Sequence, residues 1–306
     1  MLLEIKNIKK TYHEKGKSPV YAVQNVSFCV PQGGCRGIVG ESGCGKSTLL
    51  RIISGMEKPD QGQIRFMGEE LPPSGRFSDR HALQMVFQNS LDAVVPYRTA
   101  EKIVSEPLWN FFHVSKKECD ARVVELFRMV GLDPDERYKY PYQFSGGQLQ
   151  RICIARALAA EPKLLLLDEP LSSLDVSVQA QILNLLLDLK SSLNLTYLLV
   201  SHDLEAVYYL SDSLTVMYAG YVMETLEDIR QINELIHPYS LKLLHASNGF
   251  REKYAEPLDH LCMSNVCGNG CPYAGRCTFA KEICYTSVPG LVEWRKGHFV
   301  ACHNCC

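Results

Sequence analysis

Lysine, serine and threonine follow a glycine-rich run between residues 40 and 48. The run matches G-x-x-x-x-G-K-S, the pattern of phosphate-binding loops. Its glycines let the backbone curl so that successive N–H groups point inward toward an anion. Lys46 can reach the outer phosphates, and Ser47 can offer its hydroxyl to Mg²⁺. The candidate phosphate contacts are Gly40, Glu41, Ser42, Gly43, Cys44, Gly45, Lys46, Ser47 and Thr48.

Two carboxylates end an apolar run further along the chain, where residues 164–167 are all leucine and Asp168 and Glu169 follow. Ligands of open α/β sheets bind at the C-terminal ends of the strands. We therefore expect Asp168 to hold the Mg²⁺ shell and Glu169 to polarise the attacking water, because phosphoryl transfer depends mainly on positioning and charge stabilisation. A strand that merely ends in solvated acids is the alternative, and the phosphate loop upstream disfavours it.

A second glycine pair lies between these motifs, in the sequence Phe-Ser-Gly-Gly-Gln of residues 144–148. A serine and two glycines at a predicted helix start form another anion-binding site. Two phosphate sites in one nucleotidase make sense if the second holds a nucleotide that is bound to another molecule. The candidate contacts here are Ser145, Gly146, Gly147 and Gln148.

The elements that must position these residues alternate between strands and helices. A buried strand over residues 35–39 and an amphipathic helix over 46–56 flank the phosphate loop, which favours a true loop over a chance glycine turn. Residues 2–12 and 20–30 are predicted strands of an N-terminal β layer. Further strands are predicted at 61–66, 83–87, 163–168, 195–200, 214–218 and 221–224, and a helix at 176–189. This alternation predicts a largely parallel sheet covered by helices.

The pattern becomes helical from about residue 89 to 161, which predicts a helical insert inside the α/β frame. Apolar spacing predicts one helix over residues 99–112. A second helix begins with a capping box at Ser115 and ends at Gly131, and a third begins near Ser145.

Length and charge limit the remaining possibilities. The chain has 306 residues, which is enough for one large domain and a smaller one. Its formal net charge of −2 gives no general argument for nucleic-acid binding. Its apolar runs are far shorter than the ~20 residues that a membrane helix needs. The N-terminus lacks the apolar core of a signal peptide. We expect a soluble chain that reaches any membrane through partners.

The motifs occur in the order found in the ATP-binding cassette (ABC) ATPases, and the resemblance covers roughly residues 2–240. Its segments are the phosphate loop, Gln88, residues 145–148, 167–170 and 172–175, and residues 201–203. The resemblance implies an α/β P-loop NTPase of ABC type with an N-terminal antiparallel β layer, a helical insert and a small Cys-rich C-terminal region. It also implies ATP and Mg²⁺ as cofactors, sandwiched in a head-to-tail dimer.

The same resemblance implies a role for each matching residue. Lys46, Gln88, Glu169 and His202 would be catalytic, with Glu169 as base and His202 as the switch histidine on the γ-phosphate. Ser47, Gln88 and Asp168 would contact Mg²⁺. Ser145 and Gly147 would bind the ATP of the opposite protomer. The remaining cofactor contacts would be Tyr12, stacked on adenine, and Asp175, across the dimer.

Thirteen cysteines are unevenly spread, and many crowd into residues 262–306. An intracellular ATP-using chain keeps its thiols reduced, so a cluster favours a metal over disulfides. This region resembles the tail of oligopeptide and dipeptide importer ATPases, a branch that includes nickel and metallophore importers and in which some members bind a [4Fe–4S] cluster. The implied ligands are Cys271, Cys277, Cys284 and Cys302. Cys267, Cys305 and Cys306 are extra cysteines that could serve as spare or alternative ligands. Zinc or unligated thiols remain alternatives, because the spacing is loose.

These observations predict an ABC ATPase domain over residues 1–248 and a Cys-rich region over 249–306. The expected function is ATP hydrolysis that drives an importer of peptides or a related small solute from the cytoplasmic face of a prokaryotic membrane. The resemblance implies a second ATPase subunit (a copy or a paralogue), two membrane permease subunits and, indirectly, an extracytoplasmic solute-binding protein, but no nucleic acid. A soluble ABC ATPase without transport is the alternative, and a redox or metal-binding role of the tail is a third possibility.

Overall fold

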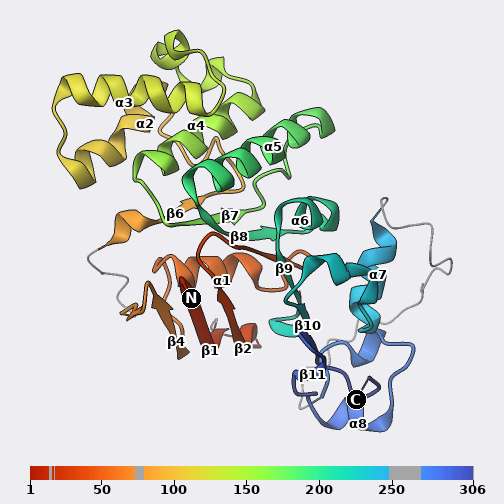
Figure 1. The fold of residues 1–306 in the computed structure, drawn as a ribbon. Coiled ribbons are helices and arrows are strands. Elements are labelled where there is room, and N and C mark those ends of the chain that lie inside the picture. The colour runs from red at the N-terminus through yellow and green to blue at the C-terminus, as the bar shows by residue number, and fades with distance from the viewer. Residues whose placement is uncertain (14–15, 17, 73–78, 248–269, 306) are drawn as a thin grey trace.

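The structure is a computed structural model that describes residues 1–13, 16, 18–72, 79–247 and 270–305. Figure 1 shows a helical region at one end, two sheets below it and the C-terminal segment beside the sheets. Every helix in the described ranges falls short of the length and apolarity that crossing a membrane requires. The architecture confirms the predicted α/β class with an antiparallel N-terminal layer.

The N-terminal layer is an antiparallel sheet with the strand order β2-β1-β4-β5. Its strands are β1 Leu3–Tyr12, β2 Val20–Val30, β4 Gln61–Phe66 and β5 Glu69–Glu70. The apolar residues of β1 and β2 alternate with polar ones, so that one face of the layer is buried and the other meets solvent. The predicted strands at 2–12, 20–30 and 61–66 are confirmed.

The second sheet is mixed and has the order β11-β12-β10-β9-β3-β8-β7-β6. Neighbours from β6 to β9 are parallel, whereas β10, β12 and β11 are added antiparallel. Its strands are β3 Cys35–Val39, β6 Leu83–Val86, β7 Leu164–Asp168, β8 Thr196–Ser201, β9 Ser213–Tyr218, β10 Tyr221–Leu226, β11 Val292–Arg295 and β12 His298–Val300. The parallel part brings the C-terminal ends of β3, β6, β7 and β8 to one edge.

Strand β7 shows how the mixed sheet separates two cores. Leu164 and Leu166 pack on one face with α1 (Lys46–Ile53) and the antiparallel layer. Leu165 and Leu167 pack on the other face with the helices, which explains why all four positions are apolar. Those helices are α5 Val176–Leu193, α6 Leu204–Leu210, α7 Pro238–Ala246 and the helices of the insert.

The helical insert contains α2 Ala100–Pro107, a π-helical turn Leu108–Phe112, α3 Lys116–Met129 and α4 Gly146–Ala159. The helix predicted over 99–112 is confirmed, but its second half is π-helical and not α-helical. Pro107 has no N–H to continue the α-helical hydrogen bonds, so the chain widens into the π turn and stops at His113, whose φ is 51°. Two 3₁₀ turns, Pro134–Tyr138 and Pro141–Gln143, lie between α3 and α4, and a third, Arg80–Ala82, precedes β6.

The Cys-rich segment from residue 270 packs against the cassette and adds strands to it. Strand β12 pairs with β10, and β11 pairs with β12. A buried contact of 2.7 Å joins His298 Nε2 of β12 to Glu224 Oε1 of β10. The segment also contains the 3₁₀ turn Ala274–Arg276 and α8 Glu282–Thr286, and the 3₁₀ turn Ile229–Glu234 lies between β10 and α7. Residues 248–269, which include Cys262 and Cys267, and residue Cys306 lie outside the described residues, and the domain boundaries stay a prediction.

Candidate active site

The phosphate loop connects β3 to α1 and has a shape that only glycine permits at Gly45. This residue has a φ of 105°, and a Cβ there would lie 1.9 Å from the carbonyl oxygen of Ala22. Gly45 also precedes α1 without any side-chain cap. The N–H groups of the first helical turn therefore remain available to an anion.

Lys46 is buried at the start of α1, where its Nζ donates to the carbonyl oxygens of Gly40 (2.7 Å) and Glu41 (3.0 Å). The ammonium thus lies within the curve of the loop, close to where phosphates would be held. Burial raises the pKa of the neighbouring Cys44 thiol, which keeps it neutral beside the lysine.

Asp168 at the end of β7 lies beside Ser47 of α1, as the two motifs predicted. The Ser47 hydroxyl donates to Asp168 Oδ1 at 2.9 Å. Burial raises the pKa of Asp168, and the hydrogen bond from Ser47 opposes that shift. One hydroxyl and one carboxylate oxygen at a phosphate site are the hard ligands that Mg²⁺ prefers, so these residues fit the ion.

Glu169 follows β7, and its side chain contacts a residue beyond the end of each of two other strands, Gln88 after β6 and His202 after β8. Its Oε2 accepts from Gln88 Nε2 at 3.1 Å and lies 3.0 Å from His202 Nδ1. The Glu169 backbone has a φ of 44°, a left-handed conformation that costs energy for a residue with a Cβ. Its N–H donates to Val200 of β8, which holds the turn in place. A carboxylate set between an amide and an imidazole can accept a proton from water and keep that water oriented.

Ser172 is a member of this group that the sequence did not predict. Gln88 Nε2 also donates to Ser172 Oγ at 3.3 Å, and Ser172 Oγ donates to the Glu169 carbonyl at 3.2 Å. The serine therefore ties the glutamine to the turn that follows the two carboxylates. The sequence signal that could have identified Ser172 was its position three residues after Glu169.

The phosphate loop, Gln88 and Glu169 line a pocket of about 1090 Å³, whereas Asp168, Ser172 and His202 are not among its lining residues. Tyr12 lies on one wall, and its hydroxyl donates to Glu57 Oε2 at 2.6 Å. Gly270 and Pro272 of the Cys-rich segment lie on another wall, a contribution that the sequence did not predict. The remaining lining residues are Ser18, Pro19, Val20, Tyr21, Ala22, Gln24, Ser42, Gly43, Gly45, Lys46, Ser47, Thr48, Gln88, Glu169, Ala219 and Tyr221.

The Ser-Gly-Gly-Gln motif begins α4 in the helical insert and contributes nothing to the pocket lining. Ser145 Oγ accepts from Gln148 N at 3.3 Å, and Gln148 Oε1 accepts from Ser145 N at 3.0 Å. Gly147 lies so close to α5 that a Cβ would come within 2.4 Å of a Val178 methyl group. The structure therefore does not bring this motif to the phosphate loop of the same chain.

Asp175 also lies away from the pocket lining and caps α5. Its Oδ1 accepts from Ser177 Oγ at 2.7 Å and from the Val178 N–H at 3.0 Å. These two hydrogen bonds lower the pKa of the exposed Asp175 carboxyl. Asp175 and the α4 motif are thus both helix caps on the insert side of the molecule (Figure 1).

Known proteins resemble both the motifs and the fold. The family model described as ABC transporter matches residues 23–172. The oligopeptide transport ATP-binding protein AppF of Bacillus subtilis is 39% identical, over 99% of this chain and 97% of that protein. The chain belongs to the ABC transporter family. OppF of Haemophilus influenzae, also an oligopeptide transport ATP-binding protein, is 39% identical over 98% of this chain and 93% of its own length.

Solved ABC structures agree with this membership. The ATP-binding cassette MJ0796, in a dimeric post-hydrolysis state bound to ADP and Pi, has a TM-score of 0.67 and 31% identity, over 74% of this chain and 99% of that one. Membership makes this chain an ATPase that uses ATP with Mg²⁺. The match to single cassettes leaves about a quarter of the chain for elements beyond the cassette.

The four cysteines implied as ligands lie together in that additional part. Cys271, Cys284 and Cys302 are buried, and Cys277 is half-buried. Burial raises the pKa of the Cys271 thiol to about 11, and the other three thiols add to the shift. Among the described residues, however, no group of three or more His, Cys, Asp or Glu side chains has the arrangement of a metal site. The thiols as placed here do not fit a metal or cluster.

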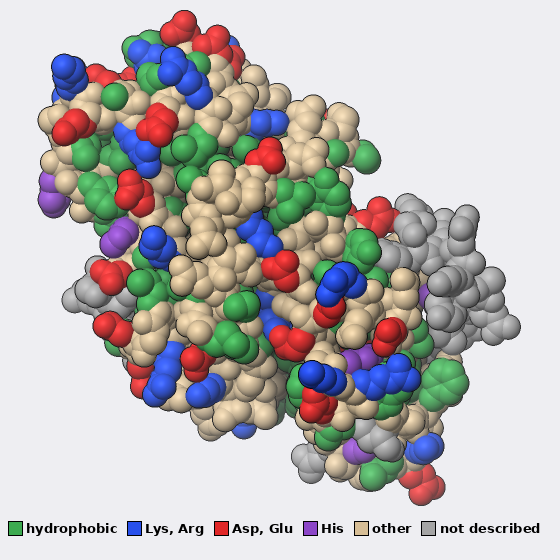
Figure 2. Space-filling view, in the orientation of Figure 1, with side chains coloured by type: hydrophobic (Ala, Val, Ile, Leu, Met, Phe, Trp, Pro, Cys, Tyr) green, Lys and Arg blue, Asp and Glu red, His purple; other side chains and the backbone are tan. Residues whose placement is uncertain are grey.

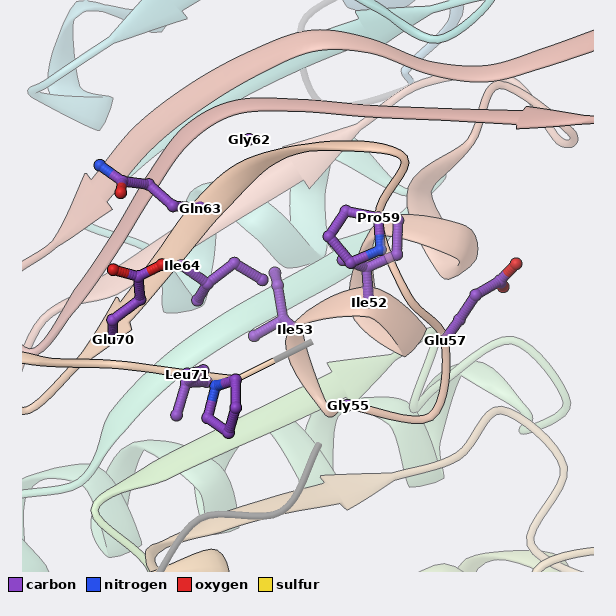
Figure 3. A pocket seen from close by; sticks show the side chains of 11 residues that line it. Ile52, Ile53, Gly55, Glu57, Pro59, Gly62, Gln63, Ile64, Glu70 and Leu71 are labelled. Carbon is purple, nitrogen blue, oxygen red and sulfur yellow. The ribbon is translucent and has the colours of Figure 1, made fainter. Parts of the chain in front are cut away.

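A second, small pocket lies at the far end of α1, under the antiparallel layer. Figure 3 shows Ile53 of α1 facing Ile64 of β4 across it, with Ile52 beside Pro59. Its volume is about 30 Å³. This space holds a water molecule or two, and it is too small for an organic ligand.

Proposed function

We propose that this chain hydrolyses ATP to drive the uptake of peptides through the membrane subunits of an ABC importer. The observation that supports this most is the extent of the similarity. Proteins named for oligopeptide transport align with 99% and 98% of the chain, so that the Cys-rich tail is included and not only the cassette. A family resemblance confined to the cassette would have left the type of transport open.

In this proposal the pocket residues divide the ATPase chemistry between them. Lys46 and the loop N–H groups hold the phosphates, and Ser47, Asp168 and Gln88 hold Mg²⁺. Glu169 takes the proton of the attacking water, and His202 and Gln88 orient that carboxylate. The support is the shared oxygen Oε2, which lies 3.0 Å from His202 and 3.1 Å from Gln88.

The working unit in this proposal is a dimer. Residues 145–148 and Asp175 would complete the ATP site of a second ATPase subunit, either a copy of this chain or a paralogue. Two observations support it: these residues are absent from the pocket lining of their own chain, and the similar cassette MJ0796 is a dimer. Tyr12 would stack on adenine at the pocket wall.

The permease subunits would contact the helical insert at the cytoplasmic face of a prokaryotic membrane. The exposed aromatic side chains of the π turn, Phe111 and Phe112, support this. They lie against the half-buried His81 of the 3₁₀ turn Arg80–Ala82, with ring centroids 6.1 and 5.6 Å apart. Figure 2 shows hydrophobic side chains among charged ones over this part of the surface. Exposed apolar groups of this kind are typical of protein contacts. The solute would arrive through an extracytoplasmic binding protein.

Whether Cys271, Cys277, Cys284 and Cys302 bind an iron–sulfur cluster is tested separately from ATP hydrolysis and import. Four thiolates match the ligand set of such a cluster, but the side chains as placed do not form a metal site. Iron, sulfide and zinc analysis after anaerobic purification distinguishes a cluster, a zinc ion and unligated thiols. One zinc per chain without iron removes the cluster.

Peptide import is tested by reconstituting the chain with its permease subunits and binding protein in liposomes. We expect ATP-dependent accumulation of a labelled peptide, and the Glu169→Gln variant serves as the inactive control. Co-purification provides the independent test. A chain recovered only with ribosomes or DNA, and never with membrane subunits, contradicts import and favours a soluble ABC ATPase.

A further inference from the structure

Glu41 places a negative charge inside a loop that binds polyphosphate. It directly follows Gly40, the first residue of the phosphate loop, and its side chain is only partly exposed. A carboxylate at this place repels the negative charges of a nucleotide unless a cation neutralises it. Lys46 contacts the backbone of the loop through the carbonyls of Gly40 and Glu41. The positive charge that meets the Glu41 carboxylate comes from elsewhere.

Arg276 of the Cys-rich tail supplies that charge from 235 positions further along the chain. Its Nη1 donates to Glu41 Oε2 at 2.7 Å, and its Nη2 donates to Glu41 Oε1 at 3.0 Å. This is the bidentate geometry in which a guanidinium binds a carboxylate most firmly. The pair has no net charge, so the loop keeps its affinity for anions.

Aromatic side chains hold Arg276 in this position. Its Nη1 also donates to the Tyr218 hydroxyl at 3.2 Å, and its guanidinium lies 5.6 Å from the Tyr218 ring centroid and 6.0 Å from that of Tyr273. Tyr239, which is fully buried, packs against both rings and accepts a hydrogen bond from the Glu41 N–H at 2.8 Å. The tail and α7 therefore hold both the side chain and the backbone of Glu41.

The tail is in turn firmly attached to the sheet, so it can act as a support. Cys271 N donates to Cys284 O at 2.7 Å, which closes the segment around Arg276. Strand β12 pairs with β10, and Gly270 and Pro272 line the ATP pocket. The tail thus meets the nucleotide site at its wall and at the phosphate loop.

We infer that Arg276 is a positioning residue for ATP binding: from the Cys-rich tail it neutralises Glu41 and fixes the first turn of the phosphate loop. The inference rests on the ATP-binding part of the proposed function and not on peptide import. A failure of the import experiment therefore leaves it intact. It makes the folded tail a requirement for full nucleotide affinity.

The test compares Arg276→Ala, Glu41→Gln and the double variant by titrating the full chain with Mg-ATP at low salt and measuring the steady-state KM and kcat. We expect Arg276→Ala to weaken ATP binding about three- to tenfold, because an unpaired carboxylate then remains on the phosphate loop. The kcat should stay within about twofold, since the residue acts on binding alone. Glu41→Gln should bind ATP at least as well as the wild type, and the double variant should recover most of the lost affinity.

Two controls separate the charge effect from a damaged tail. Arg295→Ala removes another tail arginine, one that pairs with Glu234 at 3.5 Å, and should leave ATP affinity unchanged. Raising the salt to about 0.5 M should shrink the defect of Arg276→Ala, because screening weakens repulsion between exposed charges. Wild-type affinity in Arg276→Ala overturns the inference. So does a double variant that binds as weakly as Arg276→Ala at both salt concentrations, because the loss then comes from displacement of the tail.

Discussion

Helices α1 and α4 both begin at glycines, but only α4 is capped by its own side chains. Gly45 precedes α1 without a cap, and the loop before it is held by distant groups, Tyr239 and Arg276. Ser145 and Gln148 form a reciprocal capping box at the start of α4. We call residues 40–48 with Gln88, Asp168, Glu169 and His202 the phosphate-loop half, and residues 145–148 with Asp175 the signature half.

The two halves differ in the contacts that hold their residues in place. The phosphate-loop half is assembled by long-range contacts within one chain, so that Ser47 meets Asp168, and Glu169 meets Gln88 and His202. The signature half is ordered by local hydrogen bonds within a few residues, and it stands apart from the ATP pocket. A locally ordered site that faces outward is suited to completing a pocket on another subunit. Variants of the two halves should therefore fail in different ways.

The largest effect is expected for Glu169→Gln in the phosphate-loop half. The amide keeps a partner for Gln88 or His202 but cannot accept a proton from water, so turnover should fall by about 10²–10⁴-fold. ATP binding should remain, and the ATP-bound protein should accumulate as a dimer. Phosphate release and light scattering measure the two properties. Turnover within tenfold of the wild type would remove Glu169 from its assigned role.

Lys46→Ala should lose affinity for ATP by at least ~30-fold, because it removes a buried cation from the curve of the phosphate loop. This defect belongs to binding, in contrast to that of Glu169→Gln. Equilibrium titration with a fluorescent ATP analogue measures it. Lys117→Ala, on the exposed surface of α3, is the control and should bind normally. Equal affinity in the two variants would contradict the assignment of the loop.

Much of this site could be predicted from sequence because its key residues belong to local motifs. The strand at 35–39 and the run that ends in Asp168 and Glu169 place side chains by alternation and by the end of a strand, and both strands lie as predicted. Because the parallel strands β6, β7 and β8 end at one edge of the sheet, Gln88 and His202 lie close enough to contact Glu169. The residues of such a motif are close in sequence, so their arrangement can be predicted without knowing how distant segments pack.

One missing contact needed more than a local pattern, whereas two other features of the structure had local signals in the sequence. The pairing of Arg276 with Glu41 spans 235 positions and depends on how the tail packs, so no spacing in the sequence indicates it. Pro107 was a local signal for the end of α2, but the prediction of one continuous helix used the apolar spacing alone. The hairpin of β11 and β12 also had a signal, since Gly297 with a φ of 74° makes its turn between alternating strands.

Ser145→Ala should separate the two roles of the signature half. Loss of the cap should cost about 1 kcal/mol of stability, and loss of a charge-assisted contact with the partner's ATP should lower ATPase activity about tenfold or more. Ser115→Ala is a matched control, because Ser115 forms the same capping box with Glu118 on α3. We expect similar losses of stability in denaturant unfolding but an ATPase defect in Ser145→Ala alone. Equal ATPase activity in the two variants would make Ser145 only a helix cap.

The smallest effects should have opposite signs in the two halves and come from Asp168 and Asp175. Burial raises the pKa of Asp168 in the folded chain, so its ionised form costs stability above that pKa. Asp168→Asn should therefore raise the melting temperature at pH 7, without nucleotide or Mg²⁺, by an amount on the order of 1–2 °C. The gain should fade as the pH drops and the wild-type carboxyl takes up its proton.

Asp175→Asn should instead lower the melting temperature slightly at pH 7. Hydrogen bonds from Ser177 and the Val178 N–H lower the pKa of Asp175, so its charge stabilises the fold above the unfolded pKa, and that contribution is lost as the pH falls through the folded pKa. Thermal melts of both variants across pH 3 to 7 measure the two trends together. Shifts of the same sign would mean that the two carboxylates share one environment, and the contrast between a buried ligand group and an exposed helix cap would then be wrong.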